Sequence, residues 1–254
     1  MFINKRQKDI LKILEEEGSS RVNHLSQILN VSEATIRRDL DLLHEAKEIK
    51  RVHGGATLND RQTFEPPINK RILINENEKQ AIGRAAASLV LDGETVYIGS
   101  GTTPLEVAKN LIYKNDLTVI TNSLPVANLI STVNGISLVF IGGFLRAGEL
   151  SFIGHIAEMS MNEVRVDKII LGIPAIDLKV GLTNDYLPEV RTDRSILNLS
   201  ETLILVADHT KFGKVASAYL APINRITTLV TDNQTDKELV NQLRDRGLEV
   251  IIAE

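Results

Sequence analysis

Apolar residues recur every three or four positions in three short N-terminal segments, which is the spacing of amphipathic helices. The segments are residues 5–17, 22–29 and 33–45. A tight turn separates the second segment from the third. Residues 49–52, IKRV, then predict a strand, and residues 53–56, HGGA, predict a turn. Helices with a tight turn between the last two, followed by a strand and a turn, predict a winged helix-turn-helix.

From residue 78 onward, short apolar runs alternate with helical segments. The predicted strands are residues 95–99, 117–121, 136–143, 167–173, 202–208, 226–232 and 248–253. The predicted helices are residues 78–90, 104–110, 125–131 and 236–246. Apolar strands joined through helices predict an α/β domain with a mainly parallel sheet that is covered on both faces.

The segment between these two regions is polar, contains Pro66 and Pro67, and has no clear period. Such a composition is typical of a linker. We therefore expect a winged helix-turn-helix domain at residues 1–57, a linker at 58–77 and an α/β domain at 78–254.

Composition narrows the possible functions. The chain has no cysteine, so disulfides, thiolate metal sites and cysteine nucleophiles are excluded, and its five histidines show no metal-ligand spacing. We expect no metal and no cofactor. No apolar run approaches the roughly 20 residues that span a bilayer, so we expect a cytoplasmic protein with no membrane partner. Residues 1–57 carry a net charge of +1 and the remainder −5, so DNA would have to meet a local basic patch.

The third predicted helix supplies such a patch. Ser32 suits its N-cap. A step of about 100° per residue places Ile36 and its apolar neighbours on one face, with Ala34, Arg37 and Arg38 on the opposite face. Exposed arginines can bind guanine or phosphate with two hydrogen bonds. The alternative is a surface ion pair between Arg37 and Asp41.

The segment VSEATIRRDLDLLHEAKEIKRVHGGA closely resembles the N-terminal signature of DeoR-type bacterial transcriptional regulators. It matches that signature at Val31, Ser32, Thr35 to Leu40, Arg51, and His53 to Ala56, and it departs from it at Lys47. The resemblance implies operator binding and places the HGGA turn as the tip of the wing. The residues predicted to contact DNA are Ser32, Ala34, Thr35, Arg37, Arg38, Arg51, His53 and Gly54.

The ends of the predicted strands suggest a ligand site, because ligands bind beyond the carboxyl ends of parallel strands. The first strand ends in GSGTTP, residues 99–104, where glycines and a helix N-terminus suit a phosphate. Later strand ends supply Asn122, Gly143 and Lys211. Each feature alone also has a structural explanation: a tight turn, a helix cap or a surface lysine. Together they favour a small phosphorylated polyol.

The resemblance extends through this second domain. DeoR-type effector domains resemble sugar-phosphate isomerases of the ribose-5-phosphate type, which implies a Rossmann-like fold similar to ribose-5-phosphate isomerase. The isomerases carry catalytic carboxylates in a G-A-D-E-x-D stretch. Here GIPAID, residues 172–177, has Pro174 at the first of those aspartates and keeps only Asp177, which could orient a sugar hydroxyl or cap a turn. Gly99 also stands where the family often has an aspartate.

Three hypotheses follow for the whole chain. The favoured one is a DNA-binding regulator whose second domain binds a sugar phosphate and has no catalytic residues. We expect a repressor of a carbohydrate-utilisation operon that the sugar phosphate releases from operator DNA, with an activator as the alternative. The others are an active isomerase with a DNA-binding appendage, and a scaffold whose helix-turn-helix contacts protein. A two-fold operator would require a homo-oligomer, either a dimer or a tetramer. The residues predicted to bind the effector are Ser100, Gly101, Thr102, Thr103, Asn122, Gly143, Asp177 and Lys211.

Overall fold

The computed structural model describes residues 4–17, 19–46, 48–52, 54–58 and 66–254 of the chain. The chain divides into two compact units, residues 1–63 and residues 64–254. The second unit therefore takes in most of the expected linker, because residues 66–77 already contain a helix and the start of another.

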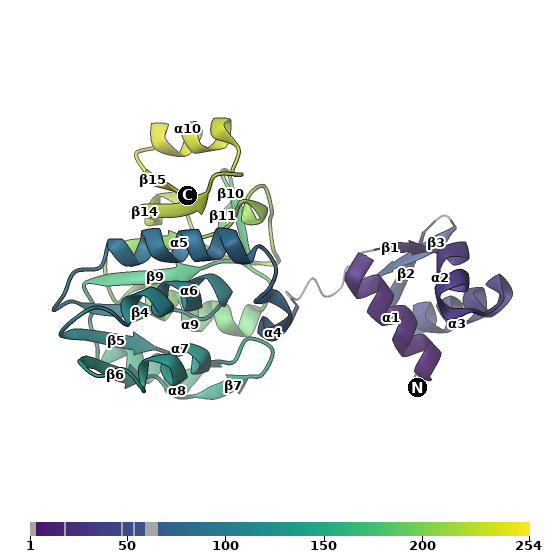
Figure 1. The fold of residues 1–254 in the computed structure, drawn as a ribbon, viewed down its shortest axis with the longest axis horizontal. Coiled ribbons are helices and arrows are strands. Elements are labelled where there is room, and N and C mark those ends of the chain that lie inside the picture. The colour runs from purple at the N-terminus through teal and green to yellow at the C-terminus, as the bar shows by residue number, and fades with distance from the viewer. Residues whose placement is uncertain (1–3, 18, 47, 53, 59–65) are drawn as a thin grey trace. The chain divides into compact units, whose positions relative to one another are not determined.

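The first unit packs helices against a small antiparallel sheet with strand order β1-β3-β2 (Figure 1). Its elements are α1 (Lys5–Glu17), β1 (Ser19–Arg21), α2 (Val22–Leu29), α3 (Glu33–Glu45), β2 (Ile49–Val52) and β3 (Gly55–Leu58). These helices and β2 confirm the predicted ranges. The wing is larger than predicted, because β3 starts inside the expected turn and β1 pairs with it.

A buried carboxylate holds α3 to α1. The apolar core of the unit consists of Ile10, Leu14, Val22, Leu25, Ile36, Leu40, Leu43, Ile49 and Ala56. Beside this core, Asp39 is only 3% exposed and accepts hydrogen bonds from Arg6 Nε at 2.5 Å and from Gln7 Nε2 at 3.4 Å. A buried charge is stable only when it is paired in this way, so Asp39 fixes the position of α3.

The second unit is built on a parallel sheet with strand order β15-β14-β12-β9-β4-β5-β6. These strands are β4 (Thr95–Ile98), β5 (Leu117–Thr121), β6 (Ile136–Phe140), β9 (Lys168–Gly172), β12 (Leu203–Val206), β14 (Thr228–Asp232) and β15 (Glu249–Ala253). Each corresponds to a predicted strand with slightly different ends. The prediction of an α/β domain with a mainly parallel sheet is confirmed.

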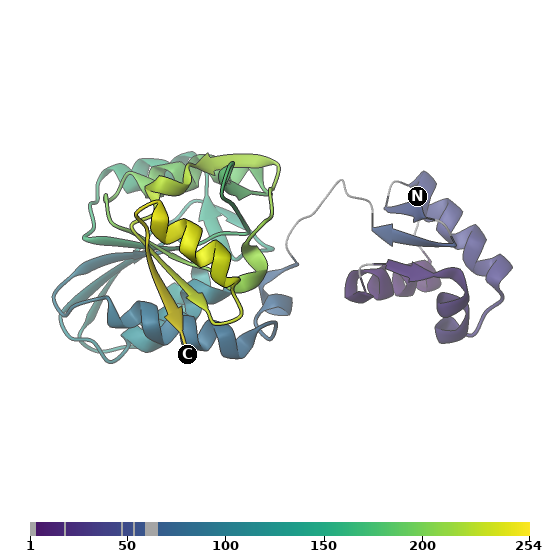
Figure 2. The same cartoon turned by 90° about the horizontal axis from the view of Figure 1, so that it is seen from above.

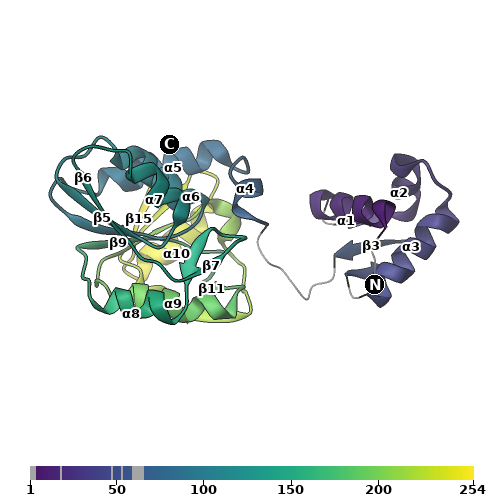
Figure 3. The same cartoon turned by 90° about the horizontal axis from the view of Figure 1, so that it is seen from below.

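Helices cover both faces of this sheet (Figures 1 and 3). The helices are α4 (Ile68–Arg71), α5 (Glu76–Ser88), α6 (Thr102–Leu111), α7 (Leu124–Ile130), α8 (His155–Asn162), α9 (Leu187–Leu197) and α10 (Lys237–Asp245), the last drawn in yellow in Figure 2. Successive side chains of a strand point to opposite faces. Accordingly, Val96 and Ile98 pack with α5, α6 and α7, whereas Tyr97 packs with α8, α9 and α10.

Several elements were not predicted. They are α4, α8, α9, the hairpin of β7 (Phe144–Arg146) and β8 (Ser151–Ile153), and the antiparallel sheet of β10 (Ala175–Asp177), β11 (Gly181–Asn184) and β13 (Ala218–Ala221). Two 3-10 turns, η2 (His209–Lys211) and η3 (Ile223–Arg225), were also missed. All of these elements except α9 are short, and all mix polar with apolar residues, so neither a helical nor a strand period is visible in them.

The strand order reverses between β9 and β4. The chain runs from β4 outward to β5 and β6, then returns to β9 and continues on the other side to β12, β14 and β15. Loops leaving β4 and β9 therefore diverge at their carboxyl ends and open a crevice. In open α/β sheets, this reversal is where ligands bind.

Candidate functional site

The N-terminal half of α3 presents the predicted arginines to solvent. The Ser32 hydroxyl caps the helix by accepting the amide of Thr35 at 3.2 Å. Because Ile36 and Asp39 are buried on the opposite side, Arg37 and Arg38 are exposed, as is Ala34. The predicted division of this helix into a buried and an exposed face is confirmed.

The alternative pairing of Arg37 with Asp41 does not form. Arg37 Nη2 lies 3.2 Å from Glu33 Oε2, an exposed pair that costs little to break. Asp41 instead accepts a hydrogen bond at 2.9 Å from Nη1 of Arg51 in β2, and the same nitrogen donates to the Arg37 carbonyl at 3.3 Å. Arg51 thus links the wing to the exposed face of α3.

The predicted tip of the wing is only partly covered by the structure. His53 lies outside the described residues. Gly54 is exposed, adopts φ of +78°, and its carbonyl accepts the amide of Val22 at 2.9 Å. A positive φ of this kind favours glycine, because a Cβ would strain the backbone.

A pocket opens at the carboxyl ends of β4 and β9, where the strand order reverses. Its empty volume, which includes the open space at its mouth, is about 590 Å³. Its lining comprises Arg71, Ser100, Gly101, Thr102, Thr103, Pro104, Arg146, Glu149, Leu171, Gly172, Ile173, Pro174, Asn184, Asp185, Glu189, Asp193, Val206 and Lys211.

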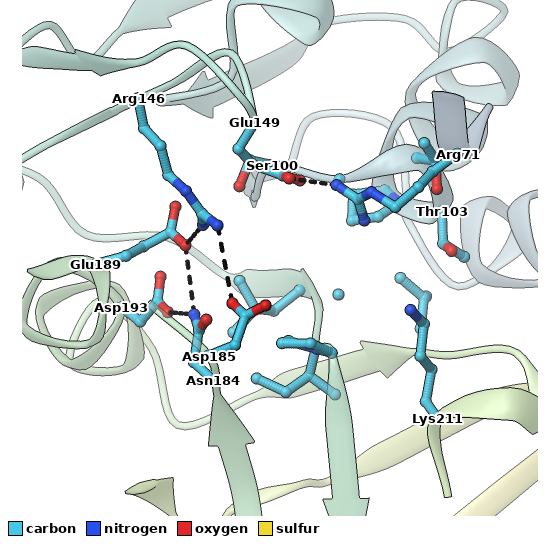
Figure 4. Close-up of a pocket in the computed structure, with 18 residues that line it drawn as sticks. Arg71, Ser100, Thr103, Arg146, Glu149, Asn184, Asp185, Glu189, Asp193 and Lys211 are labelled. Atoms are coloured by element: carbon cyan, nitrogen blue, oxygen red, sulfur yellow. Dashed lines mark hydrogen bonds and ion pairs between the residues drawn. The ribbon is translucent and has the colours of Figure 1, made fainter. Parts of the chain in front are cut away.

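One wall of the pocket suits an anion. It is formed by the loop before α6, by Arg71 from α4 and by Lys211 from η2 (Figure 4). The first amides of a helix have no partner within the helix and point toward its N-terminus. Gly101, with φ of +117°, turns the chain into α6, whose first residues Thr102 and Thr103 line the pocket.

The opposite wall is rich in carboxylates (Figure 4). Glu189 on α9 accepts hydrogen bonds from Ser151 Oγ at 2.9 Å and Asn184 Nδ2 at 3.3 Å, and it also pairs with Arg146. Asn184 Nδ2 donates to Asp193 as well, at 2.9 Å. Burial, reinforced by the charge of Glu189, raises the pKa of Asp193 well above its usual range. This wall can accept hydrogen bonds from hydroxyl groups, and a protonated Asp193 can donate one.

Arg146 organises the carboxylate wall. It stacks over the Tyr186 ring, 4.5 Å from the centroid, and one of its guanidinium nitrogens lies 3.8 Å from Asp185 Oδ1. Stacking of this kind holds the guanidinium in place. The pocket therefore has two different walls: one holds the α6 N-terminus, Lys211 and the Arg71–Glu149 pair, and the other holds several carboxyls around Arg146.

The structure brings together only some of the residues predicted to bind the effector. Ser100, Gly101, Thr102, Thr103 and Lys211 all line the pocket. The Asp208 carboxylate precedes η2 and caps it through the Thr210 amide. Burial raises its pKa, but the Thr210 hydroxyl and the charge of Lys211 more than offset that effect and lower the pKa overall.

The other predicted residues lie outside the pocket lining and have structural partners. Asn122 accepts the Tyr97 hydroxyl at 2.8 Å and donates to the Phe152 carbonyl at 2.9 Å. At Gly143, a Cβ would lie 2.8 Å from the carbonyl oxygen of Ile153, so glycine is required for close packing. Asp177 caps a turn: the amides of Val180 and Lys179 bind its carboxylate and lower its pKa.

Two protein-family models match the chain. Residues 6–62 match the DeoR-like helix-turn-helix domain, and residues 74–233 match the DeoR C terminal sensor domain. The chain belongs to the DeoR family. It is therefore a DNA-binding transcriptional regulator with a sensor domain, not an enzyme.

Curated DeoR-family relatives match along the whole chain. The regulator GolR of Listeria innocua serovar 6a is 34% identical over 100% of both chains. The glycerol-3-phosphate regulon repressor of Escherichia coli K12 is 33% identical over 96% of this chain and 97% of its own. Among solved structures, ribose 5 phosphate isomerase A from Neisseria gonorrhoeae is 18% identical, covers 53% of this chain and 52% of its own, and has a TM-score of 0.40.

Several pocket residues of this DeoR-family chain were missed at the sequence level. They are Arg71, Arg146, Glu149, Asn184, Asp185, Glu189 and Asp193. Two polar stretches contain most of them, GGFLRAGELS (142–151) and LTNDYLPEV (182–190). The sequence did contain a sign of these pocket residues, because charged residues cluster in both stretches directly after apolar runs.

Within the described parts of the chain, no helix is both long and apolar enough to cross a membrane.

We predict that Arg38→Ala weakens operator binding by this DeoR-family regulator and leaves its fold unchanged, and that Arg37→Ala does the same. Loss of an arginine that binds guanine with two hydrogen bonds should cost about 1–3 kcal/mol and relax specificity at one base pair. Loss of a phosphate contact should instead weaken binding to all sequences and reduce the salt dependence. Fluorescence anisotropy with the regulator's own upstream DNA distinguishes the two.

The matched control is Arg165→Ala, which removes an exposed arginine from the sensor domain. It should bind the operator like the wild type. If both α3 variants also bind like the wild type, α3 is not the recognition helix.

Proposed function

We propose that this chain is a cytoplasmic repressor of a carbohydrate-utilisation operon, released from its operator by a phosphorylated sugar. Residues 1–57 bind DNA, with Ser32, Ala34, Thr35, Arg37, Arg38, Arg51, His53 and Gly54 at the interface. Residues 78–254, together with α4, bind the effector.

The observation that carries the proposal is the polarity of the pocket. A phosphate fits the wall made by the α6 N-terminus, Arg71 and Lys211, because it supplies the negative charge that these groups favour. Hydroxyl groups fit the wall made by Asn184 and Glu189, because amide and carboxylate oxygens accept their hydrogen bonds. A ligand with a phosphate at one end and hydroxyls at the other satisfies both walls.

The names of the relatives agree with this chemistry. The Escherichia coli relative is named for the glycerol-3-phosphate regulon, and glycerol 3-phosphate is a phosphorylated polyol. The competing hypothesis of an active isomerase gains no support from relatives named as regulators. Pro174, which cannot accept a proton, also lines the pocket at the position where the isomerase pattern has a carboxylate.

We predict that a phosphorylated sugar lowers operator affinity and that the corresponding free sugar does not. The test is an anisotropy titration of operator DNA against a panel of hexose and pentose phosphates, each beside its free sugar. Typical coupling free energies of about 1–3 kcal/mol correspond to roughly 5- to 150-fold weaker binding. The Thr102→Ala variant should keep operator binding but respond less to the ligand, because it loses a pocket hydroxyl.

Ser88→Ala removes an exposed hydroxyl on α5, outside the pocket, and serves as the control for Thr102→Ala. The proposed effector class is wrong if every sugar phosphate leaves operator affinity unchanged, or if the free sugars act equally well.

We further propose that the chain forms a homo-oligomer, a dimer or a tetramer, through the β6 edge of the sheet. Residues 117–145, which include β6, contain no Asp, Glu, Lys or Arg, although 24% of the chain is charged. Soluble proteins normally protect sheet edges with charge, proline or a covering segment. The opposite edge strand, β15, has Glu249 and lies beside the charged helix α10.

Exposed apolar side chains continue from this edge onto neighbouring elements. They are Val139, Phe140, Phe144, Leu145, Ile156 and Met159. The elements that carry these side chains are in contact, because the Phe140 ring packs on Phe152 of β8 and a Cβ on Gly143 would touch Ala157 of α8. Figure 1 shows β6, β7 and α8 along one border of the sensor unit. A second copy that covers these side chains would remove their apolar surface from water, which favours association.

A second copy is the partner that fits this patch, because an open strand edge can pair with its own symmetry mate and a two-fold operator needs two α3 helices. We predict that Val139→Lys reduces the molar mass measured by light scattering and weakens operator binding. Val215→Lys, at another exposed valine, should leave the mass unchanged. An unchanged mass for Val139→Lys, or a monomeric wild type, contradicts the proposed interface.

A further inference from the structure

Arg71 connects the pocket to the segment that leads to the DNA-binding domain. It is the last residue of α4, and its side chain is 10% exposed within the pocket lining. Its Nε donates to the Pro66 carbonyl at 2.7 Å, while Nη2 pairs with the Glu149 carboxylate. Pro66 is the first described residue after 59–65, which join the sensor domain to the end of β3.

Further contacts hold α4 in place. The Ile68 amide donates to the carbonyl of Gly148 at 2.8 Å, directly beside Glu149. On the other side, the buried ammonium of Lys79 in α5 donates to the Arg71 carbonyl at 2.7 Å and to the Ile74 carbonyl at 2.5 Å. The loop at 148–149 therefore fixes one side of α4, and this loop also lines the pocket.

Glu149 already places a negative charge against the proposed phosphate site. A Cβ on Gly101 would lie 3.7 Å from Glu149 Oε1, so the carboxylate reaches the loop before α6. The Glu149 side chain is only 9% exposed, which leaves little water to screen its charge. A phosphate at this loop would be repelled by Glu149 and attracted by Arg71, whose guanidinium binds phosphate in a forked geometry.

We propose that Glu149 is an internal counter-anion, and that the phosphate of the effector displaces it from Arg71. This inference rests on the proposed function and describes how the same site is regulated. When phosphate replaces Glu149, the ion pair that joins α4 to the 148–149 loop is lost, and the backbone at Pro66 can change its position. A ligand can shift operator binding only if it favours one of two states of the protein. The states with Glu149 and with phosphate bound to Arg71 are two such states.

Two variants test this displacement, and they should change the affinity for inorganic phosphate in opposite directions. Glu149→Gln keeps the size of the side chain but removes the competing charge, so inorganic phosphate should bind more tightly. Arg71→Lys keeps the charge but loses the fork that reaches both Pro66 and Glu149, so inorganic phosphate should bind more weakly. Both variants should bind the operator about 5-fold or more weakly without any ligand, the low end of typical allosteric coupling.

The measurements use the full chain. Operator affinity comes from anisotropy, phosphate affinity from calorimetric titration at constant ionic strength, and opening of α4 from hydrogen exchange of residues 66–72. Without ligand, hydrogen exchange of residues 66–72 should be faster in Glu149→Gln than in the wild type. Glu94→Gln is the control, since it breaks another ion pair, the partly buried Glu94–Lys168 pair at the amino ends of β4 and β9. It should change none of the three measurements.

The proposal is wrong if Glu149→Gln has the operator affinity and the hydrogen-exchange rates of the wild type, even if a sugar phosphate still releases the wild-type protein. It is also wrong if Glu149→Gln binds phosphate more weakly, because both variants would lose phosphate affinity if each substitution merely destabilised the fold. If no sugar phosphate acts on the wild type but Glu149→Gln still loosens α4 and the operator complex, then the Arg71–Glu149 pair controls operator binding, and another anion must take the place of Glu149.

Discussion

Arg71 is buried beside the pocket and must keep an anionic partner, and we propose that this requirement couples effector binding to DNA binding. An unpaired buried charge is costly, so the guanidinium exchanges one anion for another but does not stay alone. In the structure the partner is Glu149. The same guanidinium holds the Pro66 carbonyl, so the choice of anion inside the pocket also affects the backbone that leads to the DNA-binding domain.

The sheet explains why these groups meet. Its strand order reverses between β9 and β4, which opens the crevice that α6 faces with its N-terminus. The Glu189 carboxylate on α9 and the arginines on α4 and β7 come from distant parts of the sequence: Arg146 pairs with Glu189, and Arg71 pairs with Glu149. The chain as a whole is acidic, so we propose that its affinity for DNA depends on the local patch on α3, which Asp39 holds in position.

The sequence predicted features that depend on local pattern. Strands such as β9 and β12 are apolar on both faces, and the buried face of α3 follows from helical spacing alone, so both were predicted. The GSGTTP loop was found because its glycines and hydroxyls directly follow a strand. Arg71, Arg146 and Glu189 were missed because their function arises from long-range pairing of charges, which no local period records. Asn122 and Asp177 were chosen for suitable chemistry, but neighbouring donors and acceptors already satisfy them.

The central claim is that effector and operator favour different arrangements of one chain, so each must weaken the binding of the other by the same factor. The most direct test measures the affinity for the most effective sugar phosphate by calorimetry, first with the free protein and then with saturating operator DNA. The account predicts that DNA lowers this affinity by the factor by which the ligand lowers operator affinity. An effector affinity that is the same with and without DNA would contradict it.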